Sequence, residues 1–116
     1  MNHPRLKILF VCAMNKQRSV TAERIYRDDA RLEVHSAGVN SGAKRRVSEA
    51  DLLWADLVFA MEREQKQWII ARFKGIKLPR IDVLEIPDEF EFMDEQLQEM
   101  LRMTLDPEIE HILKNK

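Results

Sequence analysis

Cys12 and Arg18 are the residues whose types and spacing could do chemistry, and five residues separate them. They stand between an apolar run, 6–11, and a helix-like pattern that begins at Ser19. A strand, a short loop and a helix N-terminus form an anion site, because backbone N–H groups point at the ligand and the helix dipole favours negative charge. A thiol at the start of this loop adds a nucleophile, and a guanidinium at its end adds a bidentate phosphate ligand. The pattern therefore predicts chemistry on a phosphate ester.

Hydrolysis of a phosphate monoester through a cysteine needs a thiolate, ligands for the phosphoryl oxygens and an acid for the leaving oxygen. Cys12 and Arg18 fit the first two roles by position. Ser19 is placed to cap the following helix and to donate a hydrogen bond to the thiolate. The loop between them therefore predicts two of the three components of the reaction.

The best candidate for the acid is Asp88, in the turn after the fourth predicted strand. We interpret two competing carboxylates as structural: Asp82 as a strand residue and Asp94 as a helix N-cap. Phe90 and Phe92 follow the turn, and they either wall a slot for a flat leaving group or fill the core.

Composition limits the class of protein. The 116 residues are 45% hydrophobic and 34% charged, which is typical of one globular domain, 1–116. A net charge of −1 gives no indication of a nucleic-acid partner. Cys12 is the only cysteine, which excludes an internal disulfide and is typical of the cytoplasm. The apolar stretch 8–14 is too short to span a membrane. The three histidines have no spacing typical of a metal site, so we expect neither metal nor cofactor.

Strand-like and helix-like segments alternate along the chain. We predict strands at 6–11, 32–35, 57–61 and 81–86, and helices from Ser19, at 48–54, at 63–74 and from Asp94. Gly75 is expected to end the third helix, and Asp106-Pro107 to restart the chain as a last helical turn. Strands separated by helices imply a parallel sheet with helices on both faces, which binds its ligand at the carboxyl ends of the strands.

The segment from Val11 to Ser19, followed by Ala22-Glu23, resembles the phosphate loop of the low-molecular-weight protein tyrosine phosphatases. Ser36-Ala37-Gly38 matches that family's Ser-Ala-Gly after the second strand. Segment 55–61 resembles its third strand, and 88–90 resembles its acid loop. The resemblance extends in order over most of the chain.

This resemblance implies an α/β fold: a single three-layer domain whose four-stranded parallel sheet has the order 2-1-3-4, with helices on both faces. It implies a phosphocysteine intermediate at Cys12, phosphate binding by Arg18 and acid catalysis by Asp88. Asn15 and Ser36 are expected to brace the loop. The predicted substrate-binding residues are Ala13, Met14, Asn15, Lys16, Gln17, Ser19 and Phe90.

Four features differ from the family pattern. Met14 stands where the family has glycine, and it would cost about 1 kcal/mol or more if that position required a positive φ. Gln17 replaces a second cysteine that protects the nucleophile, and Val20 replaces a proline. The segment 39–54 is shorter than usual. These features are typical of a compact, divergent member.

We therefore predict a cytoplasmic, monomeric phosphatase that acts on phosphotyrosine in proteins or on a small aryl phosphate and releases inorganic phosphate. Met14 and the short middle segment motivate an alternative, a module that binds phosphate or phosphopeptides without turnover. An arsenate reductase shares this loop, but its chemistry usually needs further cysteines. A phosphocysteine carrier of sugar transport would not need Arg18. Lys44-Arg45-Arg46 is interpreted as a solvated loop that could attract an anionic substrate.

Overall fold

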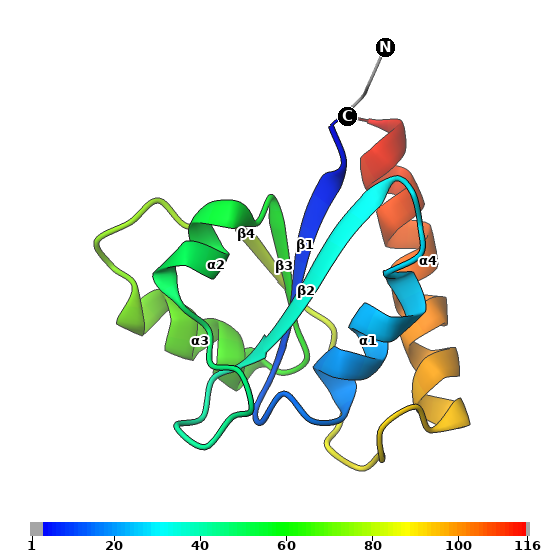
Figure 1. Ribbon diagram of the computed structural model, residues 1–116, viewed down its shortest axis with the longest axis horizontal. Coiled ribbons are helices and arrows are strands. Elements are labelled where there is room, and N and C mark those ends of the chain that lie inside the picture. Colours follow the sequence, from blue (N-terminus) through cyan, green and yellow to red (C-terminus); the bar gives the residue numbers. More distant parts are fainter. Residues whose placement is uncertain (1–3, 116) are drawn as a thin grey trace.

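The two central strands of the sheet are short, largely apolar runs that parallel pairing buries on both faces. The computed structural model describes residues 4–115. It alternates four strands with four helices: β1 (Leu6–Cys12), α1 (Arg18–Tyr26), β2 (Leu32–Gly38), α2 (Glu49–Trp54), β3 (Leu57–Ala60), α3 (Arg63–Arg72), β4 (Arg80–Val83) and α4 (Glu95–Lys114). All neighbouring strands are parallel, in the order β2-β1-β3-β4 (Figure 1). The predicted α/β fold and strand order are confirmed.

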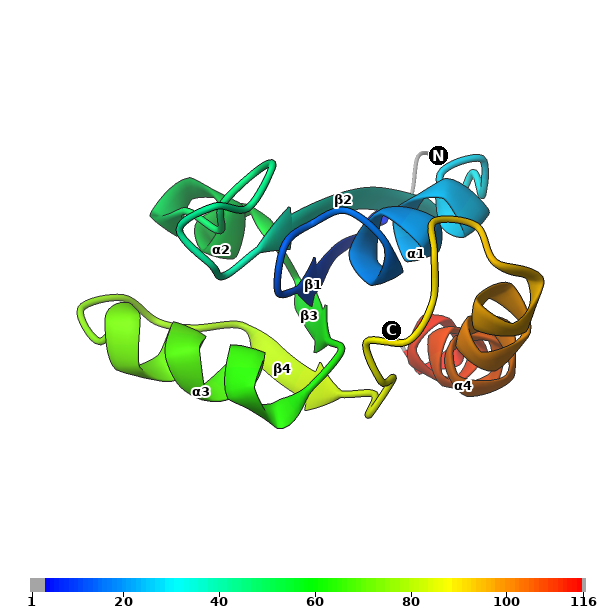
Figure 2. The same ribbon diagram turned by 90° about the horizontal axis from the view of Figure 1, so that it is seen from below.

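Side chains that alternate along β1 divide the core into two halves. Ile8 and Phe10 belong to a cluster with α1 and α4, whereas Leu9 and Val11 belong to a cluster with α2 and α3. Successive strand residues point to opposite faces, so one apolar run supplies both clusters. Figure 2 shows the resulting layers, with α2 and α3 on one face of the sheet and α1 and α4 on the other.

Two strand ends differ from the prediction by three residues, and the other strand limits by one residue at most. β2 continues to Gly38, because residues 36–38 pair in register with β1. β4 ends at Val83, before the predicted end at Ile86. Glu85 adopts a φ of 58°, which takes the backbone out of the extended region. The N–H of Ile86 still donates to the carbonyl of Met61, so the chain after β4 remains beside β3.

The last helix, α4, runs through Pro107, so the predicted restart at Asp106-Pro107 is wrong. A proline inside a helix costs about 3 kcal/mol, through a lost hydrogen bond and a clash with the preceding turn. Leu105 and Ile109 flank it in sequence and are almost completely buried. Burial contributes about 1.5–3 kcal/mol for each such side chain. Core packing on both sides of Pro107 therefore offsets its cost and keeps the helix continuous.

The other helix boundaries shift by one or two residues. α1 begins at Arg18 and no side chain caps it, so the predicted cap by Ser19 is wrong. α3 ends at Arg72 with Phe73 at its C-cap, and Gly75 therefore does not end it. α2 begins with a capping box, in which Ser48 and Asp51 make reciprocal hydrogen bonds.

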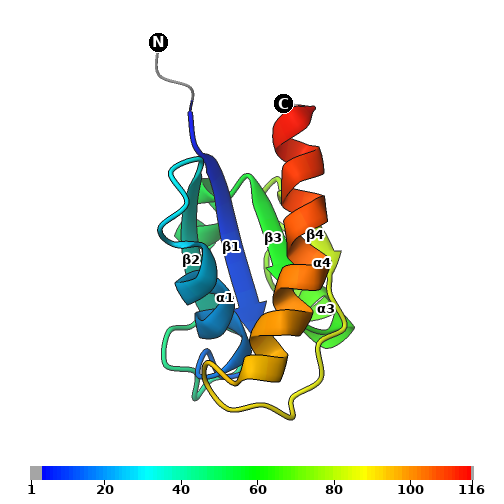
Figure 3. The same cartoon turned by 90° about the vertical axis from the view of Figure 1, so that its right-hand side faces the viewer.

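The loops that leave the carboxyl ends of the strands meet at one edge of the sheet, the lower edge in Figure 1. They are the loop 13–17 after β1, the segment after Gly38, the turn at Glu62 and the segment 84–94 after β4. Figure 3 shows α1 and α4 packed on the same face, with the loop between β1 and α1 below them. Within residues 4–115, no helix is long and apolar enough to cross a membrane.

Candidate active site

The loop after β1 is held by hydrogen bonds from the segment after β2. The carbonyls of three successive residues accept from backbone N–H groups at 3.0–3.1 Å: Cys12 from Val39, Ala13 from Asn40 and Met14 from Lys44. None of the described peptide bonds is cis. In a trans peptide the N–H points opposite to the carbonyl. The N–H groups that follow these carbonyls are therefore turned away from the segment 39–44.

These inward N–H groups make the loop an anion cradle. The N–H of Asn15 points at the Cys12 Sγ, at 3.3 Å. Among the described residues, the N–H groups of Ala13, Met14, Lys16 and Gln17 make no hydrogen bond. The N-terminus of α1 follows at once and adds the positive end of its dipole. The predicted loop residues 13–17 therefore supply backbone donors around the thiol.

Gly38 lies where the end of β2 packs against this loop. A Cβ at this position would lie 2.6 Å from the Ala13 carbonyl oxygen and 2.9 Å from the Asn15 nitrogen. Real Cβ atoms do not approach backbone atoms so closely, so only glycine fits here without movement of the loop. The family's Ser-Ala-Gly signature thus has a steric reason in this chain.

We expect Gly38→Ala to move the loop and to lower kcat/KM of the phosphatase reaction predicted from the sequence by about 10²-fold, because a displacement of about 1 Å costs that much in a positioned site. The rate of aryl phosphate hydrolysis measures the effect. Gly75→Ala is the matched control, since a Cβ at Gly75 meets no atom within 4 Å. Equal rates for both variants would mean that the loop tolerates the displacement.

Cys12 is the buried nucleophile candidate, with 2% of the residue exposed. Its Sγ lies 3.0 Å from the Ser19 Oγ and accepts from the Asn15 N–H. The surrounding hydrogen bonds fix which atom donates. Asn15 Nδ2 donates to the Oγ atoms of both Ser19 and Ser36, at 2.9 and 3.0 Å. The Ser19 hydroxyl accepts there, so its own proton is available to Sγ. Two donors therefore stabilise a negative charge on Cys12.

Asn15 is the centre of the support for the loop. It adopts a φ of 56°, the left-handed conformation that asparagine tolerates best among non-glycine residues. Ser36, one of its two partners, donates its own proton to the Glu23 carboxylate. This chain from Glu23 through Ser36 to Asn15 ties α1 and β2 to the loop. The structure thus brings together Asn15 and Ser36 as predicted, and it adds Glu23.

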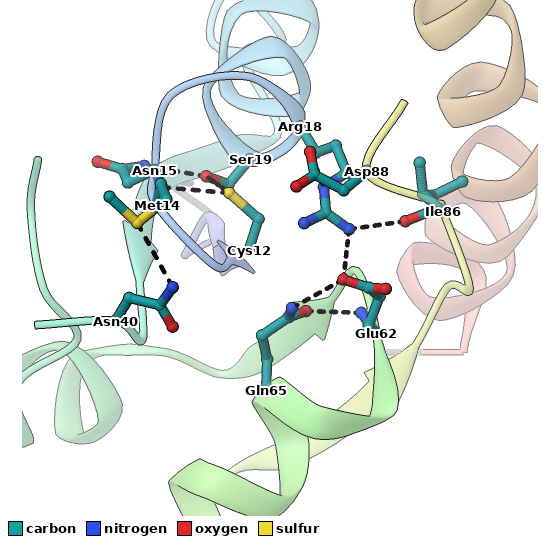
Figure 4. A network of polar contacts seen from close by, with 10 residues as sticks. All are labelled: Cys12, Met14, Asn15, Arg18, Ser19, Asn40, Glu62, Gln65, Ile86 and Asp88. Carbon is teal, nitrogen blue, oxygen red and sulfur yellow. Dashed lines mark hydrogen bonds and ion pairs between the residues drawn. The ribbon is translucent and has the colours of Figure 1, made fainter. Parts of the chain in front are cut away.

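Arg18 is the second buried group, and its side chain is also 2% exposed. Its Nη1 donates to the Glu62 carboxylate at 2.7 Å and to the Ile86 carbonyl at 2.8 Å (Figure 4). No hydrogen bond among the described residues uses its Nε or Nη2. These two nitrogens form the planar edge that binds two oxygens of a phosphate. Anchoring of Nη1 therefore orients the guanidinium and leaves the Nε–Nη2 edge without a hydrogen bond.

Glu62 is a site residue that the sequence analysis missed. It lies after β3, and Gln65 both accepts from its backbone N–H and donates to its carboxylate. The hydrogen bond from Arg18 lowers the pKa of Glu62, against the effect of partial burial. The carboxylate is therefore charged at neutral pH and balances Arg18. The available signal was a Glu-x-x-Gln capping pattern directly after the third strand.

We expect Glu62→Ala to lower kcat/KM about 10- to 100-fold, since Arg18 then loses its charge partner and its orientation. Glu62→Gln retains an acceptor oxygen for Nη1 and should recover most of the rate. Steady-state hydrolysis and thermal unfolding of both variants measure these effects. A purely structural role would lower the melting temperature of Glu62→Ala and leave kcat/KM of the folded enzyme unchanged.

Asp88 lies on the opposite side of Arg18 from Glu62 (Figure 4). Its Oδ1 is 3.9 Å from the Arg18 Nε, and its side chain is 63% exposed. The competing carboxylates are structural, as interpreted: Asp82 pairs with Arg80, and Asp94 caps α4. Asp88 is thus the predicted acid that the fold brings to the loop.

The aromatic residues after this turn have different surroundings. Phe90 is partly buried and packs against the core. Phe92 is 48% exposed and lines a groove beside the loop with Asn15 and Lys16. Substrate binding by Phe90 stays a prediction, and part of its side chain packs against the core. Phe92 is the better candidate for a pocket wall, because it lines this groove.

Met14 occupies the family's glycine position without a positive φ, so the expected backbone strain does not arise. Its Sδ lies 3.4 Å from the Asn40 Nδ2, on the side of the loop that faces the segment 39–44 (Figure 4). The side chain therefore packs outside the cradle. Gln17 is the residue before α1 and makes no capping hydrogen bond with its side chain.

Within residues 4–115, no group of three or more histidine, cysteine, aspartate or glutamate side chains could hold a metal ion. Besides the Lys16 amine, the titratable groups at the loop are one thiol, one guanidinium and the carboxylates of Glu23, Glu62 and Asp88. The thiol is a candidate nucleophile, the guanidinium is a candidate phosphate ligand, and the carboxylates include the candidate acid.

A parallel 2-1-3-4 sheet with a Cys-to-Arg loop before its first helix is the fold of the low-molecular-weight protein tyrosine phosphatases. No protein-family model matches the sequence, and no curated protein is significantly similar to it. Solved structures do match over almost the full length. YfkJ from Bacillus subtilis superposes with a TM-score of 0.77 at 20% identity, over 100% of this chain and 99% of that one.

Two further matches carry activities in their descriptions. SP-PTP, a low molecular weight protein tyrosine phosphatase from Streptococcus pyogenes, has a TM-score of 0.77 at 14% identity, over 90% of this chain and 91% of its own. The YwlE arginine phosphatase from Geobacillus stearothermophilus has a TM-score of 0.68 at 22% identity, over 92% and 96%. The chain thus shares its fold with this tyrosine phosphatase and this arginine phosphatase. The resemblance implied the fold of the tyrosine phosphatases, and the arginine phosphatases are added by the comparison.

Proposed function

We propose that this protein is a metal-independent cysteine phosphatase that hydrolyses phosphotyrosine in proteins or a similar aryl phosphate. The observation that carries the proposal is the arrangement around one loop. Cys12 Sγ stands at one end with two hydrogen-bond donors, and the Nε–Nη2 edge of Arg18 stands at the other. Unused backbone N–H groups lie between them. Such donors stabilise the charge on the equatorial oxygens of a transferring phosphoryl group.

The reaction follows from these positions in two steps. The Cys12 thiolate attacks phosphorus, the bond from phosphorus to the aryl oxygen breaks, and the Asp88 carboxylic acid gives its proton to that oxygen. Asp88, now a carboxylate, takes a proton from water as the water attacks the phosphocysteine. The sulfur–phosphorus bond breaks and inorganic phosphate leaves. Ser19 donates to Sγ as it becomes the leaving group.

The likeness to YwlE supports a second candidate, an arginine phosphatase. Phosphoarginine differs from an aryl phosphate because its leaving group is a guanidinium that carries positive charge. Lys16 is exposed in the phosphate loop, and Lys44 lies beside it. These cations repel a guanidinium and tolerate a phenol. The charge around the loop therefore favours the aryl substrate.

Phosphate release from two peptides of one sequence, one with phosphotyrosine and one with phosphoarginine, tests the proposal at pH 7 with EDTA present. We expect hydrolysis of the phosphotyrosine peptide with kcat/KM at least about tenfold higher. The reverse preference would assign the protein to the arginine phosphatases. Binding of inorganic phosphate without hydrolysis of either peptide would favour the non-catalytic module. Met14 no longer supports that module, since its side chain lies outside the cradle.

A further inference from the structure

A groove of about 440 Å³ begins at the phosphate loop and extends along α1. Its lining residues come from the loop, from one face of α1, from the segment after β2 and from the segment before α4. They are Asn15, Lys16, Val20, Glu23, Arg24, Arg27, Lys44 and Phe92. Glu23, Arg24 and the C-cap residue Arg27 follow Val20 by three, four and seven residues, so these side chains lie along one face of the helix. We call this surface the α1 groove.

The α1 groove is strongly cationic. Four of its side chains carry a positive charge, and the described residues offer none of them an ion pair. By contrast, Arg31, Arg45 and Arg80 are each paired with carboxylates. The only carboxylate in the groove belongs to Glu23, which already accepts the Ser36 proton as part of the loop support. A protein with a net charge of −1 therefore concentrates unpaired positive charge beside its candidate nucleophile.

The loop Lys44-Arg45-Arg46 contributes only one of its three cations to this surface. Arg45 bonds to Asp51 and to the Ser36 carbonyl. Arg46 donates to the Val39 carbonyl and lies over the Trp68 ring. Lys44 is left to face the groove. Two of these residues therefore fix the loop, and the third adds to the charge of the groove.

We propose that the α1 groove binds acidic side chains next to the phosphorylated residue of a protein substrate. This inference rests on the proposed function, because it names the substrates of the same site. Asn15 and Lys16 line both the cradle and the groove, so a chain whose phosphate occupies the loop continues into the groove. Arg24, Arg27 and Lys44 then meet its carboxylates, and Val20 and Phe92 contact its apolar parts. Complementary charge of this kind sets partner choice and the rate of association.

Two phosphotyrosine peptides of equal length test the proposal, one with aspartate and glutamate beside the phosphotyrosine and one with asparagine and glutamine. We expect the wild type to favour the acidic peptide by about tenfold in kcat/KM at low salt, with a smaller preference at high salt. Arg24→Glu combined with Arg27→Glu should abolish or reverse the preference. Hydrolysis of p-nitrophenyl phosphate, which has no flanking residues, should stay unchanged in this variant.

Lys74→Glu combined with Lys77→Glu is the matched control. Both lysines are exposed and precede β4, at the amino ends of the strands and away from the loop. This variant makes the same change in net charge and should keep the preference for the acidic peptide. Equal kcat/KM for both peptides in the wild type, or a preference that survives in the groove variant, would overturn the proposal.

Binding distinguishes a failure of the groove from a failure of the proposed function. If p-nitrophenyl phosphate is not hydrolysed, the proposed function fails. Fluorescence anisotropy of the two labelled peptides then tests the groove: the wild type should bind the acidic peptide more tightly, and the groove variant should lose this preference. Equally tight binding of a single-stranded oligonucleotide that the groove variant loses would also overturn the proposal, since the groove would then select polyanions rather than acidic peptides.

Discussion

Cys12→Ser is expected to lower the hydrolysis of p-nitrophenyl phosphate by about 10⁴-fold or more. A serine hydroxyl remains protonated at neutral pH and is a far weaker nucleophile than a thiolate. Cys12 is the only cysteine of the chain, so no second thiol replaces it. The measurement is p-nitrophenol release at pH 5–7 with EDTA present. The phosphocysteine should also appear in the intact mass of wild-type protein quenched during turnover, and be absent from the variant.

The fold should survive this change. Serine is slightly smaller than cysteine, and its Oγ is able to contact both the Ser19 hydroxyl and the Asn15 N–H, the two partners of Sγ. The melting temperature should therefore stay within a few degrees of the wild type, in line with about 1 kcal/mol for a single altered hydrogen bond. Turnover that persists in a folded Cys12→Ser protein would remove Cys12 from the mechanism and the proposed function with it.

The strand, loop and helix around Cys12 were predictable because their signals are local. An apolar run buried on both faces marks β1, and a polar turn with a helical pattern after it marks the start of α1. The alternation of such segments constrains the sheet to be parallel. The place of Asn15 in the loop was also predictable, since a left-handed position in a tight loop favours asparagine.

The partners of Arg18 were not predictable in the same way. Glu62 is 44 residues away in sequence and Ile86 is 68 residues away. They meet Arg18 only because parallel strands end at one edge of the sheet. Glu23 belongs to the segment that resembles the family's phosphate loop, but its hydrogen bond with Ser36 depends on how α1 packs beside β2. The exact contacts of a site formed by several loops follow from packing, which a single sequence does not encode locally.

At Pro107 and Met14, a rule based on the local residue type predicted the wrong backbone conformation. A proline usually marks a helix start, yet the buried apolar face of α4 extends on both sides of Pro107. A glycine position in a family usually signals a positive φ, yet here that conformation belongs to the next residue, Asn15. In both places, tertiary packing decided the outcome and local propensity did not.

Asp88→Asn is expected to lower kcat by about 10²- to 10⁴-fold for a phosphotyrosine peptide, the range typical of a lost general acid. Asparagine matches aspartate in size and cannot give a proton to the leaving oxygen. The loss should be smaller for p-nitrophenyl phosphate, because p-nitrophenolate is a weaker base than tyrosinate and leaves with less help. Comparison of kcat for the two substrates measures the difference.

Glu89→Gln is the matched control for Asp88, since this neighbouring carboxylate is exposed and makes no ion pair among the described residues. It should keep kcat close to the wild type for both substrates. The ratio of the kcat losses that Asp88→Asn shows with the phosphotyrosine peptide and with p-nitrophenyl phosphate then identifies the role of Asp88. Equal losses would mean that Asp88 acts on the binding or orientation of Arg18, whose Nε lies 3.9 Å from its carboxylate. An unchanged kcat with phosphotyrosine would exclude Asp88 as the acid and leave Glu23 and Glu62, the other carboxylates at the loop, to test.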